Sequence, residues 1–212
     1  LAMLKLGKLD IRTYLAPITF GNTGNLGLPL AFFAFGSVGF DFAVIVFAVM
    51  AILSFTIGVW VVSGGGSPIA AIKEPMVWAT ILGGIFLVNG WMLPTWAVNT
   101  LDLVGQIAIP VMLITLGVAL ARLKTGAFTR AIWLSLAKYA ICISVPVGVG
   151  IAFALPPIAL GALVVQVSTP VAVTSYMLAE KYEADAEQVA GLVVVSTLMS
   201  VIAIPVVLAF LI

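Results

Sequence analysis

Histidine is absent from this sequence, and cysteine occurs once, at Cys142. Without histidine, the protein lacks the commonest general base, a common zinc ligand and every hydrolase triad that uses imidazole. A single cysteine excludes an intrachain disulfide. Because Cys142 lies in an apolar run, we interpret it as a small residue of the core. Charge is also scarce, because 8% of the residues are charged, against about 25% in a soluble domain. Lys and Arg form no basic cluster, so we expect no nucleic-acid partner.

Apolar residues take the place of the missing charge. They make up 63% of the 212 residues, and the mean hydropathy is +1.29. A soluble domain averages about 45–50% apolar residues. We therefore expect an all-α polytopic membrane protein. The first 12 residues, which begin at Leu1, are too polar for a signal peptide, so we expect this start to lie inside a longer chain.

Seven segments are long and apolar enough to cross a bilayer as helices, which takes about 20 residues each. They are residues 14–35, 42–62, 75–92, 97–121, 131–155, 158–179 and 189–212. With seven spans, the basic loops all fall on one side of the membrane, and the three alternate loops carry no Lys or Arg. The basic loop residues are Lys5, Lys8, Arg12, Lys73, Arg122, Lys124, Arg130 and Lys181. The positive-inside rule then places the visible N-terminus in the cytoplasm and the C-terminus outside a cell (inner or plasma) membrane.

Two of these spans contain turn-forming residues in the middle of an apolar run. Residues 21–29 read GNTGNLGLP, and residues 166–175 read QVSTPVAVTS. Each stretch is followed by a half-span, a short polar loop and a long apolar helix. Because the first span runs outward and the sixth runs inward, the two units are inverted relative to each other. We expect the C-terminal seven helices of a ten-helix transporter made of two inverted five-helix repeats.

The expected domain organisation follows from this repeat. Residues 1–62 hold the last two helices of the N-terminal repeat, 63–74 form a cytoplasmic linker, and 75–212 form the complete C-terminal repeat. Broken helices at matching positions of inverted repeats indicate a substrate site at the repeat interface. The N-terminal end of each half-helix offers free N–H groups and partial positive charge, which favour an anion.

Three stretches resemble the auxin efflux carrier family, which includes the plant PIN auxin exporters and bacterial permeases for malate and malonate. They are GNTGNLGLPLAFFAFG at 21–36, AIPVMLITLGVAL at 108–120 and STPVAVTSYMLAEKYEADAEQVAGLVVVSTLMSVIAIP at 168–205. The resemblance implies ten helices, of which the fourth and ninth are unwound and cross; these would be the first and sixth spans here. It also implies that Gly21 takes the place of the family's first crossover proline. Asn22 matches the asparagine near the substrate carboxylate, and Pro170 matches the second proline.

We expect the polar residues of the two breaks to contact the substrate. These residues, with the second proline, are Asn22, Thr23, Asn25, Gln166, Ser168, Thr169 and Pro170. The expected hinge positions are Gly21, Gly24, Pro29 and Pro170. A structural alternative stays open, in which the polar side chains cap the half-helices or bond freed carbonyls. Nearby hydroxyls are expected to serve helix packing: Thr174, Ser175, Ser196 and Thr197.

Lys138 is the one charge that lies clearly within an expected span. A charge at the bilayer centre costs at least about 2.5–3.5 kcal/mol, so a functional role is one hypothesis for Lys138. Snorkelling to the cytoplasmic end of its span, two turns away, is the favoured interpretation. Neither break contains an acidic residue, so we expect no carboxylate-based ion site and no metal site there.

The leading hypothesis is a secondary transporter or facilitator of a small organic anion, auxin-like or a dicarboxylate such as malate, that works by alternating access. The alternatives are a sodium-coupled symporter of the bile-acid type and a non-transporting membrane subunit that binds a ligand. An enzyme is not expected, because the chain has no constellation of His, Cys or paired intramembrane Asp. The expected partners are the anion, the lipid bilayer and a second copy in a homodimer, with no cofactor.

Overall fold

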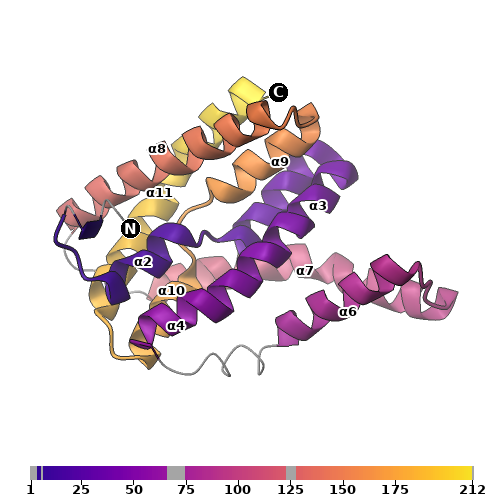
Figure 1. Cartoon of the computed structure of the whole chain (residues 1–212), viewed down its shortest axis with the longest axis horizontal. Coiled ribbons are helices and arrows are strands. Elements are labelled where there is room, and N and C mark those ends of the chain that lie inside the picture. The colour runs from indigo at the N-terminus through magenta and orange to yellow at the C-terminus, as the bar shows by residue number, and fades with distance from the viewer. Residues whose placement is uncertain (1–3, 6, 66–74, 123–127, 212) are drawn as a thin grey trace.

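A computed structural model describes residues 4–5, 7–65, 75–122 and 128–211 of the chain (Figure 1). The expected linker at 63–74 falls largely outside these ranges, as do Lys73 and Lys124. The elements named within them are all helices. In chain order they are α2 (Ile11–Thr19), η1 (Thr23–Gly27), α3 (Leu28–Leu53), η2 (Ser54–Gly58), α4 (Val59–Val62), α6 (Pro75–Asn89), α7 (Thr95–Arg122), α8 (Phe128–Ala152), α9 (Pro157–Val167), α10 (Val173–Lys181) and α11 (Ala186–Leu211).

α3 consists of two arms that fold back on each other at Gly36. This residue has φ 67° and ψ −158°, a conformation that is essentially restricted to glycine. Leu28 and Ala31 of the first arm share a buried cluster with Ala43 of the second. The sequence predicts a polar loop at 36–41, which is wrong in extent, because the helix resumes directly after Gly36. One glycine in this conformation reverses the chain without further residues.

Four helical stretches of the described residues are long and apolar enough to cross a membrane. They are Thr23–Val62, Thr95–Thr115, Phe128–Ala152 and Ala186–Leu211. The expected span at 158–179 is instead divided between α9 and α10, and the expected span at 14–35 between α2, η1 and the first arm of α3. The all-helical class is therefore observed, whereas the count of seven spans stays a prediction.

The helix α9 lies between α3 and α8, and α11 packs on α8 and α10 (Figure 1). Small residues allow the close contact between α3 and α9. Ala162 is fully buried, and a Cβ at Gly161 would lie 2.5 Å from the ring of Phe35. Such small-residue contacts are typical of helix packing in membranes. α2 packs against α4 and α11 and thereby brings the N-terminal segment onto the C-terminal helices.

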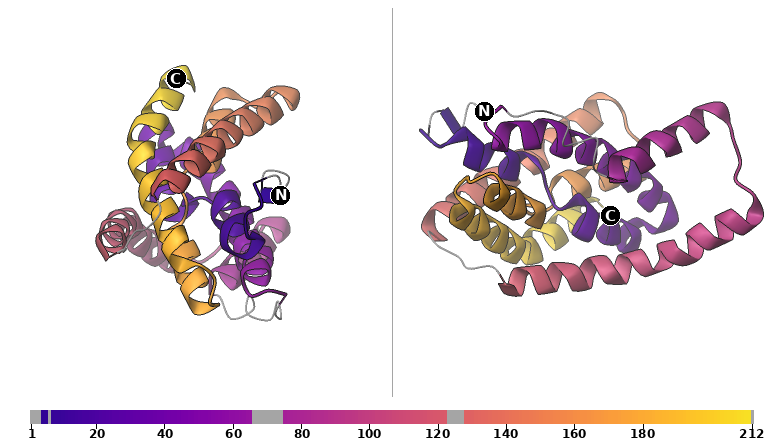
Figure 2. Two further views of the ribbon diagram at one scale, coloured as in Figure 1. Left: turned by 90° about the vertical axis from the view of Figure 1, so that its left-hand side faces the viewer. Right: turned by 90° about the horizontal axis from the view of Figure 1, so that it is seen from below.

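α7 runs along one side of the other helices, and α6 diverges from α7 away from the turn that joins them (Figures 1 and 2). α7 contacts η1, α3 and α10 through part of its length. Many apolar side chains of α7 are exposed, and those of Leu103, Val104 and Ile114 are each more than half accessible. Helices with all backbone groups bonded internally and apolar side chains outside suit a lipid environment.

Candidate functional site

The helical backbone is interrupted at 20–22 and at 168–172, and the two interruptions meet. Gly21 and Val171 form an antiparallel bridge. The N–H of Asn22 donates a hydrogen bond to the carbonyl of Pro170 at 2.7 Å. Two segments that are far apart in the sequence therefore satisfy each other's backbone groups at the point where each helix has stopped.

The second interruption follows from three consecutive residues, Ser168, Thr169 and Pro170. Proline has no N–H to donate and disfavours helical torsions in the residue before it. The hydroxyls of Ser168 and Thr169 donate to carbonyls of the last turn of α9, at 2.6 and 2.8 Å. Both side chains are buried, and neither lines the pocket described below. Their observed role is to close the C-terminal end of α9, which is the structural alternative left open by the sequence.

Ser196 of α11 supports the same interruption from the other side. Its Oγ accepts a hydrogen bond from the N–H of Val171 at 2.9 Å and donates to the carbonyl of Val193 at 3.3 Å. The sequence predicts a helix-packing role for Ser196, and the structure adds a hydrogen bond to the break itself. Thr197 bonds only within its own helix, to the carbonyl of Val193 at 2.7 Å.

Gly21 is required by the close approach of the two segments. A Cβ at this position would collide with Oγ1 of Thr169 and would lie 3.0 Å from the carbonyl oxygen of the same residue. The resemblance implied that Gly21 takes the place of a family proline. At this position the structure leaves no room for a side chain.

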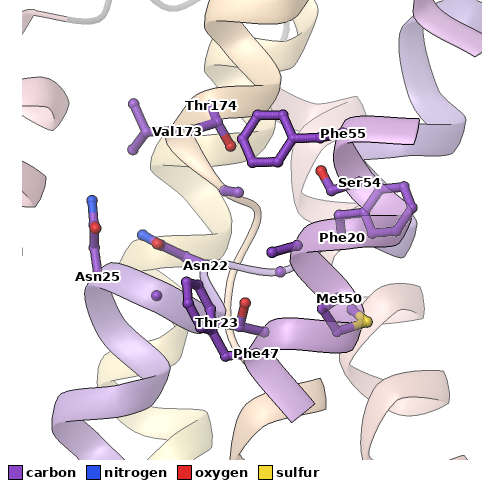
Figure 3. Close-up of a pocket in the computed structure, with 14 residues that line it drawn as sticks. Phe20, Asn22, Thr23, Asn25, Phe47, Met50, Ser54, Phe55, Val173 and Thr174 are labelled. Carbon is purple, nitrogen blue, oxygen red and sulfur yellow. The ribbon is translucent and has the colours of Figure 1, made fainter. Parts of the chain in front are cut away.

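A pocket of about 150 Å³ opens beside the meeting point (Figure 3). The first interruption and η1 form one wall, the start of α10 a second wall, and the end of α3 with η2 a third. The lining residues are Phe20, Gly21, Asn22, Thr23, Gly24, Asn25, Phe47, Met50, Ala51, Ser54, Phe55, Ala172, Val173 and Thr174. Both η1 and η2 are π-helical turns, a conformation that is frequent at functional sites.

The polar groups of this pocket include unsatisfied hydrogen-bond donors. The side chain of Asn22 is 6% exposed, and its Nδ2 has no partner among the described residues. α10 begins in the same pocket, and its N-cap residue, Ala172, supplies no side-chain cap. The first N–H groups of a helix lack intrahelical acceptors and carry partial positive charge. An amide donor and a helix N-terminus are both groups that can donate hydrogen bonds to an anion.

The other predicted site residues divide into two groups. Thr23, Gly24 and Asn25 line the pocket with Asn22. Gln166 does not line it: this side chain is fully buried beside Gly27, and neither atom of its amide has a partner among the described residues. Pro29 lies in the first turn of α3, where proline is compatible with a helix, and its expected hinge role stays a prediction.

Sequence reasoning missed the third wall of the pocket. Phe47, Ser54 and Phe55 come from the second arm of α3 and from η2 (Figure 3). In the apolar run at 42–62, the sequence does not distinguish Phe47 and Phe55 from lipid-facing residues. Of these three residues, Ser54 alone is polar. Thr174 also lines the pocket, in addition to the packing role that the sequence predicts for it.

Lys138 does not reach the membrane surface, so the favoured expectation of snorkelling is wrong. Its side chain is 1% exposed. Nζ donates to the carbonyl of Ile18 at 3.3 Å and lies 3.9 Å from Sγ of Cys142, one turn further along α8. The ammonium group therefore lies between the end of α2 and the next turn of α8.

Several of the described basic residues lie at one end of the molecule. Arg12 donates from Nε to the carbonyl of Val62 at 3.1 Å and from Nη2 to the carbonyl of Tyr182 at 2.9 Å. Arg130 donates to the hydroxyl of Tyr14 at 3.4 Å. A polar pocket of about 400 Å³ lies among these segments. The N-terminal segment, the start of α8 and the C-terminal ends of α4 and α10 thus lie at one end of the molecule.

Comparison with known proteins gives one family and one relative. The family described as "Membrane transport protein" matches residues 60–208. An uncharacterized transporter of Methanothermobacter thermautotrophicus is 29% identical over 191 residues, which cover 87% of this chain and 63% of that protein. The chain thus spans less than two thirds of the relative's length. No solved structure matches the chain.

Proposed function

Because this chain belongs to the membrane transport protein family, the auxin efflux carrier family, we propose that it moves a small organic anion across the membrane. The transport would be secondary transport or facilitated diffusion by alternating access. One observation supports an anionic substrate: the unpaired amide Nδ2 of Asn22 and the N-terminus of α10 lie in the same pocket. Auxin-like monocarboxylates and dicarboxylates such as malate are the substrates that we propose.

The proposed architecture is a crossover of two broken helices in inverted repeats. One broken helix consists of α2, η1 and the first arm of α3, and the other consists of α9 and α10. The bridge between Gly21 and Val171 supports this interpretation. The hydroxyls of Ser168 and Thr169 also fit this architecture. They close the C-terminal end of α9 without placing a negative charge near the anion.

The proposed chemistry is carboxylate binding by neutral and dipolar donors. A carboxylate would accept hydrogen bonds from Nδ2 of Asn22 and from the first N–H groups of α10. Phe47 and Phe55 would cover the apolar part of the substrate. In the proposed site Asn22 and Thr23 bind, whereas Ser168, Thr169 and Pro170 shape the break. We also propose that the end of the molecule that carries Arg12 faces the cytoplasm of a cell membrane.

Uptake into proteoliposomes tests this proposal. Full-length protein would be reconstituted and assayed with radiolabelled malate and, separately, indole-3-acetate. Asn22→Ala removes the orphan donor, and Asn22→Asp places a carboxylate where the substrate carboxylate would bind. We expect a rise in KM of about tenfold for the first variant and a greater loss for the second, because like charges repel. Asn89→Ala is the matched control, since its amide bonds to the carbonyl of Ile85 within its own helix, at 2.7 Å.

The outcomes separate the alternatives. Transport that is equal in wild type, Asn22→Ala and Asn22→Asp would contradict the site. Uptake that requires a sodium gradient would favour the sodium-coupled symporter. Saturable binding without uptake or counterflow would favour the non-transporting ligand-binding subunit.

A further inference from the structure

The amine of Lys138 is buried and has no carboxylate partner among the described residues. Its contacts are the carbonyl of Ile18 and the thiol of Cys142. Among the described residues, no Asp or Glu lies within ion-pair distance of its ammonium group. A buried charge is stable only when other groups compensate for the lost hydration. The compensation here comes from the end of α2, because Ile18 lies in the last turn of that helix.

The two broken helices are closed by different chemistry. At the end of α9, two hydroxyls, those of Ser168 and Thr169, bond to carbonyls of the last turn. At the end of α2, the corresponding donor is the ammonium group of Lys138, which comes from a different helix. One half-helix is therefore capped by neutral side chains, and the other is capped by a charge.

This difference matters because of the direction of the helix dipole. The C-terminal end of a helix carries about half a negative charge. α2 ends directly before Phe20 and Gly21, which line the pocket. Without compensation, the end of α2 would repel an anion in that pocket. A cation against the last carbonyls of α2 offsets this repulsion and also fixes the chain where it leaves the helix.

We infer that Lys138 is a built-in counter-charge for the C-terminal end of α2, which positions the first interruption and makes the adjoining pocket favourable for anions. The inference rests on the proposed anion site and adds a positioning residue to it. Lys138 acts through the backbone of α2, because it does not line the pocket.

Three substitutions in the full-length protein separate charge from hydrogen bonding and from packing. Lys138→Arg keeps the charge, Lys138→Gln keeps a neutral donor, and Lys138→Met keeps only the apolar volume. Ser144→Ala is the control, because Ser144 lies on α8 and donates to the carbonyl of Ala140 in its own helix at 2.7 Å. Since Lys138 has no carboxylate partner among the described residues, Lys138→Met leaves no opposite charge buried and unpaired, and we expect this variant to fold.

The first readout is the Kd for malate and for indole-3-acetate in nanodiscs. We expect the Gln and Met variants to bind about tenfold more weakly than wild type, and the Arg variant and the control to stay near wild type. The second readout is hydrogen exchange without any ligand. We expect faster exchange in peptides that cover residues 18–22 in the Gln and Met variants, and no change in the Ser144→Ala control.

The two readouts keep this inference distinct from the proposed function. If wild type binds neither probe, the proposed substrate class is wrong, and hydrogen exchange alone decides the role of Lys138. Unchanged exchange at 18–22 in Lys138→Met overturns the positioning role. Wild-type affinity in Lys138→Gln, with binding established for wild type, overturns the role of the charge.

Discussion

Gly21 shows how a single missing side chain permits two distant segments to meet. The backbone of Thr169 lies so close that a Cβ on Gly21 would contact both its hydroxyl and its carbonyl oxygen. The bridge to Val171 and the hydrogen bond from Asn22 to Pro170 depend on this approach. The position therefore requires glycine for space, although its backbone torsions are open to other residues.

We predict that Gly21→Ala destabilises the protein by about 1–3 kcal/mol, the usual cost of overpacking a well-packed site. Thermal unfolding in detergent measures the effect. Gly83→Ala is the matched control, because a Cβ at Gly83 meets no atom within 4 Å. Equal unfolding temperatures for the two variants would show that the segments separate easily. Combining Gly21→Ala with Thr169→Ala should recover part of the loss, because one of the two clashing groups is removed.

At the scale of the element, α2 is a short helix that must be held at both ends. Asp10 caps its N-terminus and accepts hydrogen bonds from the N–H groups of Arg12 and Thr13, at 3.3 and 3.0 Å, and from the hydroxyl of Thr13 at 2.6 Å. The Thr13 hydroxyl is the main cause that lowers the pKa of Asp10 below its usual 3.8. Lys138 donates to a carbonyl at the other end of α2. Side chains from outside this nine-residue helix therefore bond to its backbone at both ends.

We predict that Asp10→Ala lowers the free energy of unfolding by about 0.5 kcal/mol, the low end for an N-cap, because the carboxylate is exposed. A carboxyl group with a lowered folded-state pKa stabilises the fold above its unfolded pKa, and this contribution is lost as the pH falls through the folded value. The difference between wild type and Asp10→Ala should therefore be constant above about pH 5 and shrink below pH 3.8. Denaturation at several pH values measures it. Asp10→Asn should keep most of the cap and lose this pH dependence; a pH-independent difference for Asp10→Ala would contradict the assignment.

At the scale of the whole molecule, one end gathers basic residues from segments far apart in the chain. Arg12 bonds to the ends of α4 and α10. The opposite end holds the turn at Gly36 and the residues between α8 and α9 (Figure 1). Such a separation is what the positive-inside rule requires of alternate loops.

We predict that single cysteines at Lys8 and Lys181 react with an impermeant maleimide from the cytoplasmic side, because both lie at the basic end. Cysteines at Phe153 and Phe210, which are 76% and 87% exposed, should react from the outside. Full-length protein with Cys142→Ala is the background, and labelling of intact and opened cells is the measurement. Reaction of Lys8→Cys and Phe153→Cys from the same side would contradict the proposed topology.

The sequence predicts the membrane class and the regions of both breaks well, because these depend on local chemistry. Apolar composition requires a lipid environment, and Pro170 lacks the N–H group that would continue the helix of α9. Pro29, an expected hinge position, lies in the first turn of α3, where proline is tolerated without a break. The third pocket wall could not be predicted, because Phe47 and Phe55 reach the site only through the reversal at Gly36.

By itself, then, the sequence determined an all-helical, lipid-facing chain with two places where helices cannot continue. Only the tertiary structure decided that these places meet, that Asn22 keeps a free donor in a pocket with the start of α10, and that Lys138 faces the end of α2. The physical reason is the range of the interactions. Helix propensity and hydropathy act between near neighbours, whereas a bridge from Gly21 to Val171 depends on how whole helices pack.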